Sequence, residues 1–162
     1  MSYMVPGMTL IPQTLEWSCW YASAQMLITW RRNKTLMCES GIVDPSEDDP
    51  SIKLCKANDG IANSQIIALA RRLGLRAVPP MSPTEAAIES WLRTYGPLWV
   101  NGKKHIVVIA GIKPGEVYVY DPAPLNKGDR NWRSLAGWYV GGEGSSRDTG
   151  KNVEAVFLHC PA

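Results

Sequence analysis

The chain has 162 residues, of which 45% are hydrophobic and 20% charged, and its net charge of +2 comes from 17 basic and 15 acidic side chains. This length fits one domain with a sizeable core, so we expect a single domain over residues 1–162. The composition is that of a globular protein and excludes a disordered or fibrous chain. Basic side chains are scattered along the sequence, which is a poor footprint for nucleic-acid binding.

Membrane insertion and metal binding are both disfavoured. No apolar run approaches the roughly 20 residues that a membrane-spanning helix needs. The amino terminus "MSYMVPGMTL" lacks the basic region and apolar block of a secretory signal. The four cysteines form no C-x-x-C pair and only two histidines accompany them, so we predict no metal site and no cofactor. Cys38 and Cys55 bracket an acidic loop, either as a disulfide or as two free thiols.

The first half of the chain is predicted to hold two helices and a strand. Apolar residues fill the segment from Cys19 to about residue 32, which is typical of a buried helix with Ser18 as its N-cap. Residues 33–60 have the composition of turns and indicate an excursion over the surface. A second helix is expected over residues 64–73, with Gly74 ending it, and "LRAVP" (75–79) reads as a short strand.

The second half begins with a helix and continues as a sheet. The run "SPTEAAIESWLRTYG" offers Ser82 as N-cap, Pro83 at the first helical position, Glu85 to close a capping box and Gly96 as terminator. The β-branched and aromatic runs "PLWVN", "HIVVIAGI", "EVYVYDP" and "NVEAVFLHC" then predict an antiparallel sheet, and residues 140–152 a flexible loop. The fold class is therefore α+β, with helices packed on a C-terminal antiparallel sheet.

Reactive side chains lie at the predicted ends of helices and strands. Cys19 is at a predicted helix start, where backbone N–H groups favour a thiolate. His105 opens one strand and offers a proton shuttle. Asp121 ends the next strand, and a hairpin turn at "KPGE" would place its carboxylate beside the imidazole to orient it. Gln13 precedes the cysteine closely enough to form an oxyanion hole with the backbone N–H of Cys19.

These residues carry a resemblance to a known family. "PQTLEWSCWYASAQM", followed by "HIVVIAG" and "YVYDP", resembles the papain-like cysteine peptidase superfamily, above all compact bacterial effector proteases and the leader-cleaving peptidases of bacteriocin exporters. The resemblance implies a papain-like fold in which Cys19 is the nucleophile, His105 the base, Asp121 the orienter and Gln13 the oxyanion donor. Exporter peptidases are fused to membrane segments and papain-type enzymes are longer, so a free-standing effector or toxin domain fits better.

The expected function is that of a cysteine protease, a thiol-dependent hydrolase with a Cys-His-Asp triad that cleaves a protein substrate. It would be secreted or injected and act in the cytoplasm of a target cell, with an immunity protein or inhibitor as a further partner. Two alternatives stay open. The same pair could serve another acyl transfer, such as peptidoglycan amidase, deamidase or transglutaminase chemistry, or the fold could be an inactive binding module.

Several side chains near the predicted site have competing interpretations. Trp17 and Trp20 flank Cys19 and are predicted to bind substrate, although most tryptophans belong to cores and interfaces. Asp121 precedes a proline and could simply start a turn. His159 is a rival base, but it lies in the last predicted strand with no carboxylate close behind it.

Overall fold

The structure is a computed structural model of the chain and describes residues 2–34, 63–81, 84–101, 105–135 and 155–160. The predictions for residues 35–62, for residues 140–152 and for Cys38 and Cys55 lie outside these described ranges. In chain order the elements are β1 (Tyr3–Met4), α1 (Cys19–Lys34), α3 (Asn63–Leu73), β2 (Arg76–Met81), α4 (Glu85–Tyr95), β3 (Leu98–Asn101), β4 (Ile106–Lys113), β5 (Glu116–Asp121), β6 (Asp129–Ser134) and β7 (Ala155–His159).

All seven described strands belong to one antiparallel sheet. Its order is β2-β7-β3-β4-β5-β6, and the short β1 pairs with β4 beside Gly111 and Ile112. The four strand runs expected after the third helix all appear, and the expected strand after the second helix is β2. The predicted antiparallel sheet and α+β fold class are therefore confirmed. The strands β1 and β6 were not predicted from the sequence.

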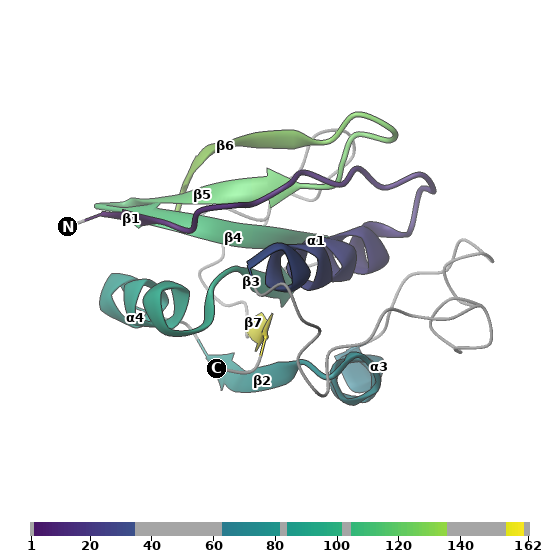
Figure 1. The fold of residues 1–162 in the computed structure, drawn as a ribbon, viewed down its shortest axis with the longest axis horizontal. Helices are drawn as coiled ribbons and strands as arrows, with labels where there is room; N and C mark the ends of the chain where they lie inside the picture. The colour runs from purple at the N-terminus through teal and green to yellow at the C-terminus, as the bar shows by residue number, and fades with distance from the viewer. Residues whose placement is uncertain (1, 35–62, 82–83, 102–104, 136–154, 161–162) are drawn as a thin grey trace.

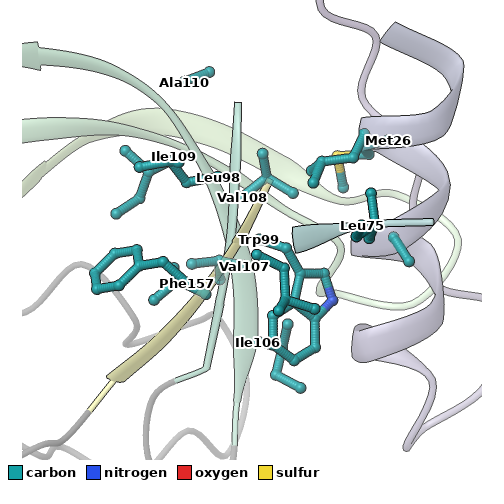
Figure 2. Close-up of a cluster of buried hydrophobic side chains, with 14 of the residues drawn as sticks. Met26, Leu75, Leu98, Trp99, Ile106, Val107, Val108, Ile109, Ala110 and Phe157 are labelled. Carbon is teal, nitrogen blue, oxygen red and sulfur yellow. The ribbon is translucent and has the colours of Figure 1, made fainter. Parts of the chain in front are cut away.

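The helix α1 is buried against the middle of the sheet, where it contacts β3 and β4 (Figure 1). Apolar residues occur almost all round it, which is the pattern of a helix inside a core rather than on a surface. Figure 2 shows part of this core, in which Met26 of α1 joins apolar side chains from β3, β4 and β7. The indole N–H of Trp99 donates to the carbonyl of Trp20 at 3.0 Å, so this buried polar group is satisfied.

The start of α4 differs from the prediction. The N-cap is Thr84, whose Oγ1 accepts from the backbone N–H of Ala87 at 3.1 Å, so the expected cap at Ser82 and first helical position at Pro83 are wrong. The Thr84 hydroxyl accomplishes what the Ser82 hydroxyl was expected to do, two residues later. The carboxylate of Glu85 accepts from the backbone N–H of Gly115 at 2.8 Å, which ties α4 to the β4–β5 turn. None of the described helices is long and apolar enough to cross a membrane.

Candidate active site

The loop before α1 delivers Cys19 to the first position of the helix. The carbonyl of Ser18 accepts from the backbone N–H of Ala22 at 3.1 Å, which opens the helical hydrogen-bond pattern. Ser18 therefore occupies the predicted N-cap position, but its hydroxyl bonds back to Leu15 instead of capping the helix. A first-turn residue such as Cys19 has no acceptor for its N–H within the helix, so that group is available to an incoming anion.

The β4–β5 hairpin brings His105 and Asp121 together as the sequence predicted. Val108 pairs with Tyr120, so the end of β5 lies next to the start of β4. Nε2 of His105 lies 2.8 Å from Oδ1 of Asp121, and the Cys19 thiol is close enough to the ring to raise its pKa. Both His105 and Asp121 are buried, the aspartate completely. The imidazole thus lies close to both the thiol and the carboxylate.

The surroundings of His105 and Asp121 favour the charged forms of both side chains. Burial by itself would lower the pKa of His105, but the hydrogen bond to Asp121 and the contact with Cys19 outweigh it and raise the pKa to about 9. Burial would likewise raise the pKa of Asp121, but His105, the backbone N–H of Ala123 and the guanidinium of Arg133 lower it. The result is a buried carboxylate that stays ionised and stabilises an imidazolium.

Gln13 lies in the same region but makes contacts that were not predicted. Its backbone N–H donates to the carbonyl of Pro122 at 2.9 Å, so the loop before α1 is joined to the segment that follows Asp121. Its Nε2 donates to the carbonyls of Leu15 and Glu16, both at 2.9 Å. The amide therefore closes the turn that leads to the cysteine, and a substrate carbonyl would compete with these two acceptors for the same NH₂ group.

The two tryptophans that flank Cys19 are placed very differently. Trp17 is 52% exposed and precedes the cysteine by two residues. Trp20 is fully buried in the core. The prediction that Trp20 contacts substrate is corrected accordingly, because a side chain packed on all sides under the sheet has no face to offer a ligand. Trp20 is therefore a core residue.

The rival residues lie elsewhere. His159 is at the end of β7, opposite Arg76 of β2, where its ring stacks on Tyr95 with 3.8 Å between centroids and its Nδ1 lies 2.7 Å from the carbonyl of Cys160. A pocket of about 640 Å³ opens there, and its lining includes His159 but neither Cys19 nor His105. The Cys160 thiol is buried, which raises its pKa to about 12 and makes it a poor nucleophile.

One charged residue of this region was missed by the sequence analysis. Arg133 of β6 places its Nη2 2.9 Å from Oδ2 of Asp121, and its side chain is only 11% exposed. The run "DRNWRS" holds Trp132 as its only large apolar side chain and shows no alternation of apolar and polar residues, so it was not predicted as a strand. Among the described residues, no group of three or more His, Cys, Asp or Glu side chains is arranged to hold a metal ion.

Together the fold and the site define a class of protein. A papain-like fold that presents a cysteine at the start of its buried helix, next to a histidine and an aspartate from the sheet, is that of the papain-like cysteine proteases. The chain belongs to the family described as papain-like cysteine protease AvrRpt2, whose model matches residues 3–138.

The comparison with solved structures agrees on the fold. The crystal structure of UfSP from C. elegans aligns with 100% of this chain at a TM-score of 0.64 and 17% sequence identity. The chain spans 35% of the length of that protein, so the likeness concerns the fold of one part of it. No curated protein sequence matches the chain.

Proposed function

We propose that the protein cleaves a protein substrate through a catalytic triad of Cys19, His105 and Asp121. The observation that carries the proposal is the position of the His105 ring, which is bonded to Asp121 through Nε2 and lies close enough to the Cys19 thiol for the thiol to raise the pKa of the ring. In this arrangement the imidazolium stabilises a neighbouring thiolate, and the buried carboxylate stabilises the imidazolium. The family to which the chain belongs supports the same chemistry.

The reaction follows from these three groups. The Cys19 thiolate attacks the scissile carbonyl and forms a tetrahedral intermediate, and the His105 imidazolium gives its proton to the leaving amine. Water then attacks the resulting thioester, with the neutral imidazole taking the water proton, and the thiolate leaves. Asp121 keeps the ring oriented through both steps and remains ionised throughout.

The oxyanion is proposed to accept hydrogen bonds from the backbone N–H of Cys19 and from Nε2 of Gln13. The helix start aims the first donor and adds the favourable end of the helix dipole. Gln13 is supported by its place beside Pro122 and next to the Cys19 loop. The half-exposed Trp17 is proposed to contact the substrate on the near side of the cysteine.

The biological setting is proposed from the family. The name AvrRpt2 suggests an effector or toxin, which would be secreted or injected and would act on a protein in the cytoplasm of a target cell. An enzyme delivered in this way could require an immunity protein or inhibitor that covers the cleft. Peptidoglycan amidase, deamidase or transglutaminase chemistry and an inactive binding module are the alternatives to be separated by experiment.

Proteome-wide mapping of new protein amino termini tests the proposal. Cells that express the wild-type chain should contain termini that are absent from cells expressing Cys19→Ala, because only the thiolate can open the peptide bond. Cys160→Ala is the matched control and should behave as the wild type. If glutamines were deamidated or cross-linked but no new termini appeared, the reaction would be another acyl transfer and not proteolysis. Identical proteomes would indicate an inactive binding module.

A further inference from the structure

A row of polar side chains on β6 leads to the active-site carboxylate of Asp121 and ends there in an ion pair. Asp129, Asn131 and Arg133 alternate along the strand and therefore share one face. The Asn131 amide donates to Asp129 Oδ2 at 3.2 Å, and Nε of Arg133 donates to Asn131 Oδ1 at 2.9 Å. The guanidinium then reaches Asp121 Oδ2 at 2.9 Å. The strand β6 lies beside β5 (Figure 1), with Asp129 paired with Asp121 and Arg133 paired with Val117, so the Arg133 side chain reaches back along β6 to the carboxylate.

The two oxygens of Asp121 have different environments. Oδ1 faces His105 Nε2 at 2.8 Å and accepts from the backbone N–H of Ala123 at 2.9 Å. Oδ2 is buried and has no partner in hydrogen-bond geometry among the described residues, so the ion pair with Arg133 is what compensates its charge there. A fully buried carboxylate whose second oxygen lacked a cation would be driven to take up a proton.

The contacts also fix the direction in which the carboxylate points. Arg133 cannot swing away freely, since Nε is held by Asn131 and Nη2 also lies 3.9 Å from Asp129 Oδ2. The charged groups around Asp121 are His105 from the start of β4 and Arg133 and Asp129 from β6. Two cations therefore face the buried anion, each at its own oxygen.

We propose that Arg133, held by Asn131, is a positioning residue that keeps Asp121 ionised and turned with Oδ1 toward His105. The inference rests on the proposed function, in which Asp121 orients the imidazole. Arg133 does not touch the reacting atoms and acts only through the carboxylate. Its role is to hold Oδ2 of Asp121 ionised and oriented, so that the His105–Asp121 bond persists to lower pH than it would without the guanidinium.

The test is an NMR titration of the protein without substrate. The carboxyl carbon of Asp121 and the hydrogen-bonded Nε2–H proton of His105 are followed from neutral to acidic pH, and Asp121→Asn serves to assign both signals. In Arg133→Met, which keeps the apolar stem but removes the cation, the Asp121 midpoint should rise by about 1 pH unit or more, a tenfold change in its protonation constant. The Nε2–H signal should be lost at correspondingly higher pH.

Matched variants separate this role from a general loss of charge. Arg130→Met removes the same charge from an exposed neighbour on β6 and should leave the midpoint within a few tenths of a unit. Arg133→Lys should fall between the wild type and Arg133→Met, because an ammonium keeps the charge but lacks the planar fork. Asn131→Ala keeps the charge and loosens the guanidinium, so it should shift the midpoint less than Arg133→Met.

The outcomes distinguish this inference from the proposed function. An Arg133→Met midpoint equal to that of the wild type overturns the positioning role. If Arg133→Met does not fold, an unshifted midpoint in folded Asn131→Ala overturns it instead. A shifted midpoint in a protein that creates no new protein termini in cells would remove the peptidase assignment and leave the Arg133–Asp121 coupling in place, since the titration requires no substrate.

Discussion

Gln13 combines two kinds of contact that a substitution can separate. Its backbone N–H and carbonyl bond to Pro122 and Asn126, and these contacts do not depend on the side chain. Its amide Nε2 bonds the carbonyls of Leu15 and Glu16, while Oε1 is buried without a partner among the described residues. A change of side chain at this position therefore removes the candidate oxyanion donor and leaves the main-chain link to the Asp121 segment.

We predict that Gln13→Ala lowers kcat by roughly 10 to 1000-fold with KM little changed, because an oxyanion donor engages its charge only as that charge develops in the transition state. Steady-state kinetics on a peptide taken from an identified cleavage site measure both constants. Thr14→Ala, at the exposed neighbouring position, is the control. A variant with normal turnover would remove Gln13 from the site, and a raised KM with unchanged kcat would assign it to substrate binding alone.

The helices α1 and α4 meet at a position that only glycine can occupy. Gly96 ends α4 with φ of 92°, and its N–H donates to the carbonyl of Leu92 at 3.0 Å. A Cβ built at Gly96 would lie 2.2 Å from a ring carbon of the buried Trp30, whose indole N–H is itself held by the carbonyl of Pro6 at 2.8 Å. The indole therefore cannot yield easily, and the end of α4 is locked to the core helix that carries Cys19.

Gly96→Ala should destabilise the fold by about 3 kcal/mol, from the positive φ and from overpacking against Trp30 together. The corresponding fall in Tm is roughly 6 to 12 °C for a protein of this size. Gly115→Ala is a matched control, because Gly115 has a φ of 77° but nothing within 4 Å of its added Cβ. Comparing the Tm values of the two variants separates the effect of the positive φ from the steric clash with Trp30. Equal losses of Tm would show that the Trp30 contact contributes nothing.

Elements with a strong local signal were predictable, and those that depend on their neighbours were not. The apolar run of α1 and the β4–β5 hairpin can be recognised from the local sequence. The hairpin also predicts that His105 and Asp121 are adjacent. The strand β6 has Trp132 as its only large apolar side chain and is fixed by pairing with β5, which local pattern does not show. Ser82 and Thr84 offer equivalent caps, and sequence alone cannot choose between them. The burial of Trp20 likewise follows from tertiary packing.

At the scale of the whole molecule, the site is assembled from segments far apart in the chain. The loop at Gln13, the start of α1, the β4–β5 hairpin and β6 meet at one end of the sheet, and the packed core of α1 on β3 and β4 holds them in register. A single domain over residues 1–162 stays a prediction. The proposed chemistry depends on this assembly through the charge state of His105, because the pKa of about 9 arises from groups on other segments.

The final prediction concerns the alkaline limb of the pH dependence of kcat/KM. Activity should fall near pH 9, because the competent form requires the imidazolium and His105 loses its proton there. Asp121→Asn should move the falling limb toward about 6.5, the ordinary pKa of histidine, since the amide removes the anion that stabilises the imidazolium. The profile is measured on the same peptide substrate for both proteins.

Chelation and alkylation provide the controls for that profile. Activity should survive EDTA, because the thiolate and imidazolium supply the nucleophile and the proton without a Lewis acid, and it should be abolished by iodoacetamide or by a peptide aldehyde that forms a hemithioacetal. If the falling limb stayed at the same pH in Asp121→Asn, Asp121 would not be the group that stabilises the His105 imidazolium. If chelation stopped turnover and added zinc restored it, the thiolate mechanism would be wrong, and Cys19, His105 and Asp121 would have to be reconsidered as metal ligands.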